Sequence, residues 1–480
     1  MSVKRLALFV LCSLFLSHVN AQDFAGYRSC NHTGVNGVFF NPANIADSRY
    51  RWDFTLFNIS AGIGNNQASF KLSDIGKTLD GDSIKNKIFS ENAGPSSAVT
   101  SLAVTGPSVF FNLGKKSALA LTSRVRTMVN AVDVDGKFAR QLIDDEGPSG
   151  LPYTFSSNTN MVAVANGWAE FGISYARVLT DEGAHFLKGG LSLKYLAGAA
   201  NASVNVDNLR SSINYDAVRQ DAYLTGASGR IGLNFGGIKL DDFEADDLLS
   251  FKSRGIGADI GFMYEYRPDL AEAPRGERRR DVNKYLLRVG VAVLDIGSIK
   301  YSRDVTRSGS YGIAVGAAQR FYLNALSNAD VDNFKDTLNK YPQYFKPDAA
   351  ASAAKYAVPL PSTVQLEVDY HLHNKLYLNL GTQLGLTKSG TKVSASQYYN
   401  AVALTPRYEG RGFGFYLPLT YNALTKFTGG AAFRLGPLFF GSGSVLSAAL
   451  GSAKQADFFI GFHFGSLQKK AGPAKAGSNN

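Results

Sequence analysis

The chain has 480 residues, a net charge of +11 and a mean hydropathy of −0.09. Beyond the first 21 residues no stretch of about 20 apolar residues occurs, which argues against membrane-spanning helices. With 49 glycines and 12% aromatic residues, the composition leaves two classes: a soluble exported protein, or a membrane β-barrel whose strands alternate apolar and polar residues.

The first 21 residues have the pattern of a signal peptide. Lys4 and Arg5 precede an apolar run over residues 6–16, and a small residue, Ala21, stands before the expected cleavage point. We therefore expect export, cleavage near Ala21 and a place in the outer membrane of a Gram-negative cell. Cleavage removes two basic residues and leaves 48 against 39 acidic ones, a net charge of +9. Cys30 is then the only cysteine, so an intrachain disulfide is excluded.

Residues 22–50 are expected to form a plug ahead of the first strand. In "FFNPANIADSRYRWDF", Asn41 suits a helix N-cap and Pro42 suits the first helical position, where its missing N–H is not needed. The pattern predicts one short helical turn over residues 43–47, inside a barrel wide enough to hold it. The plug turn is the first candidate site: Asn41, Pro42, Ala43 and Asn44.

Residues 51–466 show the alternation of barrel strands. In "STVQLEVDYHL" (362–372), the apolar side chains of Val364, Leu366 and Val368 alternate with polar ones such as Gln365 and Asp369. A soluble sandwich alternates too, but these runs reach ten residues or more, connections switch between short and long, and the chain closes on the aromatic strand "DFFIGFHFG". We predict an all-β fold, a transmembrane antiparallel β-barrel of about 14 strands: 52–63, 100–112, 117–131, 160–179, 186–200, 254–267, 284–299, 362–372, 376–387, 400–409, 413–422, 427–435, 438–447 and 456–465.

Charged residues on the polar face of these strands are expected to point into the lumen. A Lys or Arg on the lipid face at the membrane midplane costs about 2–4 kcal/mol, so strand charges belong inside or near the rims. The predicted lumen-facing polar residues are Arg124, Arg126, Lys188, Lys194, Asp259, Glu265, Arg288, Glu367 and Asp369.

The connections carry further expectations. The segments 228–238 and 311–322 could add a hairpin, and helices are expected near 328–340 and 132–147. A basic turn, "RGERRRD" (275–281), is a candidate patch for an acidic partner through Arg275, Arg278, Arg279 and Arg280, although a solvated charge run is the simpler interpretation. The acidic run at 240–247 lacks calcium-loop spacing. Residues 467–480 are expected to form a disordered, basic periplasmic tail, because they contain few apolar residues.

Two resemblances follow from these residues. The "NGVFFNPANIAD" run resembles the N-terminal Asn-Pro-Ala element of the FadL-like long-chain fatty acid transporter superfamily, which implies fourteen strands and an N-terminal plug. Over nearly the whole mature chain, "GVNGVFFNPANIADSRYRWD", "LDIGSIKY", "TPRYEGRGFGFYLPLTYN" and "LGPLFFGSGS" resemble a Bacteroidetes-type family of outer-membrane barrels of unassigned function.

No catalytic motif is present. The glycines Gly255, Gly257 and Gly261 lie within a strand pattern and suit packing, and His371 and His373 suit a solvated strand end better than a metal site. We therefore expect no enzyme activity, no cofactor, no metal and no nucleic-acid partner. The predicted function is a porin-like, passive conduit or binding site for small hydrophobic molecules, in contact with outer-membrane lipid. The alternative is a scaffold barrel that anchors a periplasmic or surface protein assembly.

Overall fold

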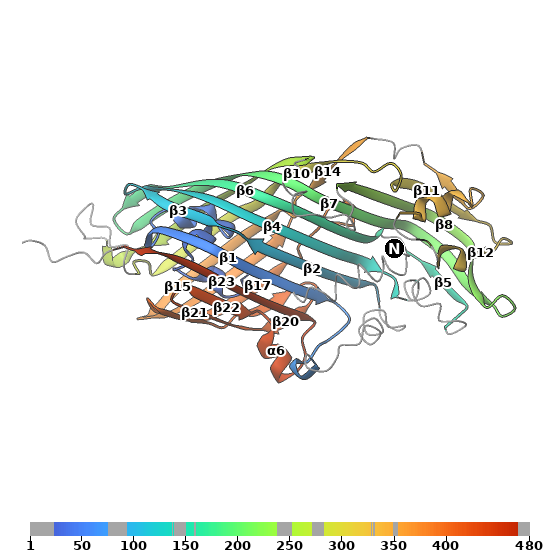
Figure 1. Cartoon of the computed structure of the whole chain (residues 1–480). Helices are drawn as coiled ribbons and strands as arrows, with labels where there is room; N and C mark the ends of the chain where they lie inside the picture. The colour runs from blue at the N-terminus through green and yellow to red at the C-terminus, as the bar shows by residue number, and fades with distance from the viewer. Residues whose placement is uncertain are drawn as a thin grey trace, which may run out of the picture.

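The computed structural model shows one antiparallel sheet rolled into a barrel (Figure 1). It describes residues 24–74, 94–136, 138, 150–157, 160–237, 252–270, 283–327, 329, 332–348 and 354–468. None of the helices in these ranges has the length and apolar character needed to cross a membrane.

The ring closes through pairing of the first strand with the last, because β1 pairs with β23 over most of its length. With each interrupted strand counted once, the ring has fourteen strands, as predicted. In ring order they are β1 (Tyr50–Asn65), β2 and β3 (Ser96–Thr105 and Ser108–Leu113), β4 (Ser117–Val134), β6 (Asn160–Glu182), β7 (His185–Asp216), β9 (Ser253–Tyr266), β10 (Leu287–Ser302), β15 (Thr363–His373), β16 (Leu376–Gly385), β17 (Ala401–Glu409), β18 and β19 (Phe413–Tyr416 and Leu419–Asn422), β20 and β21 (Lys426–Gly429 and Ala431–Leu435), β22 (Leu438–Ser442) and β23 (Gln455–Leu467).

Three ring strands are interrupted near their middle, and two of the breaks contain proline. Pro107 separates β2 from β3 and Pro418 separates β18 from β19. Proline has no N–H to donate to a neighbouring strand, so the ladder stops there and resumes after the bend.

The outer face of the ring is apolar and the inner face is polar. On β15, Leu366 and Val368 are 43% and 40% exposed, whereas Gln365 and Asp369 are 8% and 0% exposed. Aromatic rings flank this outer band, among them Trp52 and Phe464, which contact each other edge to face. This distribution is the one expected of a barrel whose outside contacts lipid.

The two ends of the ring differ in the length of their connections. Residues 114–116, 183–184 and 374–375 are short turns at the end where the chain enters and leaves the ring. The opposite end carries most of the longer connections, although the 267–286 connection between β9 and β10 begins and ends at the short-turn end. The pattern of known outer-membrane barrels predicts that the short-turn end faces the periplasm, and on that expectation it is named the periplasmic end below.

A sheet extension continues β7 beyond the ring at the long-loop end (Figure 1). The first part of β7 pairs with β9 inside the ring, and its distal part pairs with β8. The extension has its own core, which contains Ile213, Leu233, Tyr311 and Phe321. Its elements are β5 (Tyr153–Ser156), β8 (Asp221–Gly237), β11 (Gly309–Val315), β12 (Phe321–Tyr322), β13 (Phe345–Pro347), α4 (Asn324–Ser327) and α5 (Phe334–Asn339). A further strand, β14 (Lys355–Pro359), pairs with the distal part of β10.

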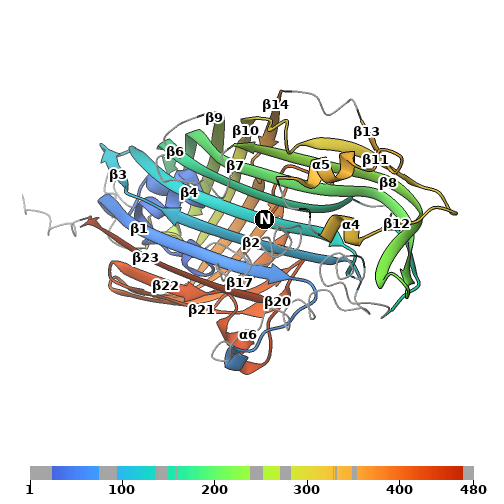
Figure 2. The same ribbon diagram turned by 45° about the vertical axis from the view of Figure 1, so that its right-hand side comes forward.

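The plug contains three short 3₁₀ helices that lie inside the ring (Figure 2). They are η1 (Tyr27–Ser29), η2 (Gly34–Phe39) and η3 (Pro42–Ile45). The predicted cap is confirmed, because the Asn41 side chain accepts a hydrogen bond from the Ala43 N–H at 2.9 Å and Pro42 occupies the first helical position.

Several predicted boundaries were wrong. The plug turn ends at Ile45, not at residue 47, where Asp47 takes a left-handed conformation with φ of 53°. The predicted helix at 132–147 begins inside β4, and its later part lies largely outside the described residues. The predicted strand 438–447 stops at Ser442 and is followed by α6 (Val445–Leu450). The segments 228–238 and 311–322 do form strands, but in the extension and not in the ring.

Candidate functional site: the plug and the lumen wall

The plug turn rests on a notch made of two glycines. Gly190 of β7 and Gly261 of β9 lie opposite each other. A Cβ at Gly190 would lie 2.4 Å from the Pro42 carbonyl carbon, and a Cβ at Gly261 would lie 2.1 Å from Asn41 Oδ1. Asn41 Nδ2 donates to two backbone carbonyl oxygens of the wall, those of Phe262 (3.1 Å) and Val291 (3.2 Å). The wall therefore has a docking site for this turn, and the site exists only because Gly190 and Gly261 lack side chains.

The second contact of the plug involves a carboxylate of β1. Asp53 Oδ1 accepts the Val35 N–H at 2.7 Å, and Asp53 Oδ2 is 2.7 Å from His463 Nδ1. Gly34 has φ of 57°, and a Cβ there would overlap the Asp53 carboxylate. Asn36 adds a polar contact, because its Oδ1 accepts a hydrogen bond from Asn58 Nδ2 at 2.8 Å.

The periplasmic end of the plug is held by ion pairs. Asp47 Oδ2 contacts Arg267 Nη2 at 2.9 Å and Lys284 Nζ at 2.7 Å, and Arg267 also binds Glu265. Burial lowers the pKa of Lys284, whose site lies outside the strands, while Asp47 opposes that shift. Lys188 donates to the carbonyl oxygen of Ala46 at 2.9 Å.

Arg288 connects the plug to a buried charged cluster on β15 and β17. It donates to Asn31 Oδ1 at 2.6 Å, and its Nη2 is 3.5 Å from Asp369 Oδ2. Asp369 is fully buried and accepts two hydrogen bonds from Arg407. Glu367 is less buried, with Oε1 at 3.8 Å from Arg288 Nε.

A second buried network lies further into the lumen. Glu170 binds Arg124 (2.8 Å) and Arg126 (2.9 Å), and Arg126 also contacts Asp295 (2.8 Å). Lys194 joins the other end of the network through contacts to two carboxylates, Asp259 at 2.7 Å and Asp295 at 2.6 Å. Three cations face three carboxylates, so the network is electrically balanced, as buried charges require.

Two cavities lie between the plug and the wall, and Arg28 lines both. The first, about 600 Å³ including space open to solvent, is at the periplasmic end. The second, about 560 Å³ measured in the same way, lies against the second network and the plug rings of Phe24, Phe39 and Phe40. Lys188 lines the first and Lys194 the second, six residues apart on β7 and so about 20 Å apart along the strand. The cavities are therefore stacked along the barrel, and Arg28 stands between them.

Arg28 is fixed by a hydrogen bond to the wall. Its Nη2 donates to Gln365 Oε1 of β15 at 2.6 Å, and its guanidinium lies 5.8 Å from the centre of the Phe40 ring. The side chain thus crosses from plug to wall at the boundary of the two cavities.

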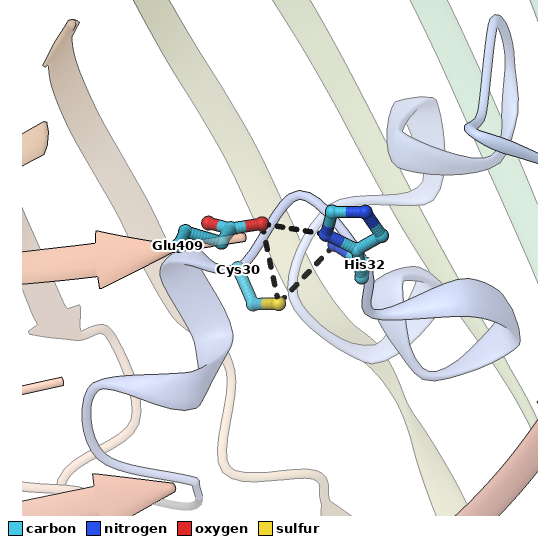
Figure 3. Close-up of side chains that lie close together, drawn as sticks. All are labelled: Cys30, His32 and Glu409. Carbon is cyan, nitrogen blue, oxygen red and sulfur yellow. Dashed lines mark hydrogen bonds and ion pairs between the residues drawn. The ribbon is translucent and has the colours of Figure 1, made fainter. Parts of the chain in front are cut away.

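Three potential metal ligands meet where the plug contacts the end of β17 (Figure 3). They are Cys30 and His32 of the plug and Glu409 of the wall. Burial raises the pKa of the Cys30 thiol to about 11 and lowers that of His32 to about 4, so both groups are neutral near pH 7. In the part of the chain that the structure describes, no other group of His, Cys, Asp and Glu side chains has metal-binding spacing.

The predicted site residues fall into three groups. The plug-turn residues contact the wall as described, with Asn44 Nδ2 bonded to the Gly37 carbonyl at 3.1 Å. The nine predicted lumen residues belong to the two charged clusters or to the contacts beneath Asp47. Arg275, Arg278, Arg279 and Arg280 lie outside the described residues. His371 is half-buried and His373 is exposed, and both are bonded to the neighbouring turn at the end of β15.

Sequence analysis missed several partners of these residues. Glu170 could have been found, because Phe171 and Ile173 point outward and place Glu170 on the inner face. Asp295 could not, because it sits at a register shift between Val293 and Ile296 with φ of 60°, where alternation fails.

Fold and site together define a membrane barrel with an internal N-terminal plug. Residues 42–443 match the model of a family of unknown function, DUF5723, and the chain belongs to that family. This agrees with the predicted barrel family of unassigned function, while the Bacteroidetes source stays a prediction.

Solved structures of similar fold include several barrels of low sequence identity. The Ralstonia pickettii toluene transporter TbuX is 12% identical with a TM-score of 0.41, covering 94% of this chain and 100% of that one. A Pseudomonas aeruginosa FadL homologue is 10% identical with a TM-score of 0.41, covering 93% and 98%. A TodX deletion mutant, described as a monoaromatic hydrocarbon channel, is 9% identical with a TM-score of 0.34, covering 91% and 95%. No curated protein matches the chain.

Proposed function

We propose that this protein is an outer-membrane barrel that conducts or binds small molecules, and that its plug is the gate. The observation that carries the proposal is the pair of stacked cavities that meet at Arg28. A barrel that served only as an anchor has no need of two cavities between its plug and its wall. Hydrogen bonds and ion pairs hold the plug to the wall, and water can replace these when the plug moves. Buried apolar contacts, such as the stacking of Tyr27 on Phe439 at 4.1 Å between ring centres, add to the cost of that movement.

The cavity linings favour solutes that carry negative charge. Six basic side chains and two acidic ones line the periplasmic cavity: Arg28, Arg49, Lys188, Arg267, Lys284 and Arg288 against Asp47 and Glu265. The inner cavity adds the aromatic rings of Phe24, Phe39 and Phe40. We therefore propose that the solutes, which the sequence predicts to be small hydrophobic molecules, are amphipathic and have an apolar part and an anionic group. A positive lining concentrates such solutes at the opening.

The proposal is tested by deleting residues 24–46 and measuring solute flux in proteoliposomes. We expect the deletion to raise flux, and to raise it more for a small carboxylate than for an amine of the same size. Heat-modifiable migration on a gel first shows that the barrel is folded. Unchanged flux from a folded deletion variant would refute gating by the plug.

A point variant separates the role of Arg28 from the loss of the whole plug. We expect Arg28→Ala to raise flux while the rest of the plug stays docked. The reason is that removal of the Arg28 side chain, which stands between the two cavities, joins them. Arg51→Ala is the matched control, since Arg51 is exposed on the outer rim. Equal flux for the two arginine variants would contradict the assigned gate position.

The scaffold alternative gains no support from the described residues. Its candidate patch, the basic turn at 275–281, lies outside them. No observation supports an enzyme activity, since the sequence analysis found no catalytic motif.

A further inference from the structure

We propose that Cys30, His32 and Glu409 form a binding site for a borderline-soft divalent metal ion such as Zn²⁺, and that the bound ion ties the plug to the barrel wall. The proposal does not rest on the proposed function, because it stands whether or not the plug gates solute flux.

The donor atoms already lie close to a metal-binding arrangement. His32 Nδ1 is 2.8 Å and Cys30 Sγ is 3.7 Å from Glu409 Oε1, and all three donors lie within 4.8 Å of one another. Tetrahedral ligands at about 2.0–2.3 Å from zinc are separated by roughly 3.3–3.7 Å. Small side-chain adjustments therefore make room for an ion at the centre.

The surroundings fix the donors in place. The Cys30 sulfur accepts the His32 backbone N–H at 3.2 Å, which holds the Cys-Asn-His segment in a tight loop at the end of η1. Glu409 is the last residue of β17, and its second oxygen accepts a hydrogen bond from Arg407 Nε at 3.0 Å. Outer contacts of this kind orient ligands in known metal sites.

Charge and proton balance allow the ion to bind. The thiol loses its proton to solvent, the imidazole keeps one proton by moving it from Nδ1 to Nε2, and the carboxylate supplies the second negative charge. A thiolate and a carboxylate then neutralise a dication. Arg407 donates to Glu409 Oε2, and Asp369 binds Arg407 on the other side and offsets its charge. Arg49 and Arg434 are further cations close enough to act on the ligands.

The site also has access and an open coordination position. Cys30 lines the periplasmic cavity, which leads to solvent. Three protein ligands leave the fourth position of a tetrahedral ion for water or another small ligand from that cavity. Because two ligands belong to the plug and one to the wall, the ion couples the two.

His185 provides a control histidine within the same barrel. It is the exposed first residue of β7, and its Nδ1 lies 2.7 Å from the Tyr264 hydroxyl. It takes no part in the plug contacts described above, so a substitution there leaves the docking of the plug intact.

The test loads the full-length, detergent-folded protein with Zn²⁺ or Co²⁺, removes excess ion and measures metal content and the cobalt absorption spectrum. We expect one ion per chain and a sulfur-to-cobalt charge-transfer band. Cys30→Ser, His32→Gln and Glu409→Gln should each lower the affinity by more than about 100-fold, since loss of an outer partner alone costs about 10- to 100-fold. His185→Gln should bind as the unaltered protein does.

Two results would overturn the site. One is the absence of bound metal on protein that migrates as a folded barrel. The other is binding that Cys30→Ser leaves unchanged, which would place the ion elsewhere. Cys30→Ser preserves a hydrogen-bonding group, so the variant should fold. If it migrates on a gel as a folded barrel, any loss of bound metal reflects the missing sulfur ligand and not unfolding.

Discussion

At the scale of single residues, the plug is positioned by absent side chains as much as by present ones. Gly190 and Gly261 leave space that Pro42 and Asn41 fill, and Gly34 does the same for Asp53. A methyl group at any of these positions would meet plug or wall atoms well inside van der Waals distance. These glycines are therefore part of the plug site, although they carry no functional group.

Filling the notch should displace the plug. We expect Gly261→Ala to push Asn41 from its two carbonyl partners, at a cost of about 1–3 kcal/mol typical of overpacking. The readout is maleimide labelling of Cys30, the sole cysteine of the mature chain, which is 4% exposed when the plug is docked. Labelling should become faster in the variant.

Gly381→Ala is the control for this change. Gly381 also lies in a ring strand, but a Cβ there would meet only Asn379 Oδ1, at 3.5 Å. If Gly261→Ala labels no faster than Gly381→Ala, the notch does not hold the plug.

At the scale of elements, the sheet extension behaves as a separate packing unit built on the end of β7. Its core gathers rings from β12, β13 and the segment after α5, with Phe321 lying 5.0 Å from Phe345 and 5.3 Å from Tyr341 between ring centres. This core does not include side chains of the plug. The extension can therefore loosen without opening the ring.

Removal of the Phe321 side chain, which lies at the centre of that core, should unfold the extension and leave the barrel folded. We expect Phe321→Ala to destabilise it by about 3–5 kcal/mol, the usual cost of truncating a buried phenylalanine. Hydrogen exchange of peptides covering residues 309–347 should accelerate, while heat-modifiable migration of the barrel is retained. Val305→Ala, at a 62% exposed position, should change neither, and loss of the barrel in Phe321→Ala would contradict independent packing.

At the scale of the whole molecule, the barrel reverses the distribution of side chains in a soluble protein: apolar side chains lie outside and charged side chains lie inside. Large exposed apolar side chains lie on the outer face of its strands, and the charged residues buried inside are paired with one another. A lipid environment favours this arrangement, because the apolar outer side chains contact acyl chains and the charged side chains inside are paired.

A charge on the outer band should therefore be costly only in a membrane. We expect Val368→Lys to lower the free energy of unfolding in lipid vesicles by about 2–4 kcal/mol, the range for a lysine near the midplane. Val218→Lys, at a 94% exposed turn of the extension, should have little effect. The measurement is urea unfolding in vesicles, and equal stabilities for the two variants would argue against lipid contact at Val368.

The sequence by itself determined the barrel, its fourteen strands and the capped turn at Asn41 and Pro42. Each depends on local rules: alternation with a period of two, turn residues and capping preferences act over a few neighbouring residues. The same rules assigned charged residues such as Arg124 and Lys194 to the polar face.

Only the tertiary structure decided which of those residues meet. Glu409 lies 377 residues from His32, and Asp295 lies 169 residues from Arg126. Closure of the ring and docking of the plug bring such residues together, and the bulge at Asp295 breaks the alternation that would have placed it. The charged networks, the stacked cavities and the Cys30, His32 and Glu409 cluster are products of that closure, because no local pattern specifies contacts across a barrel.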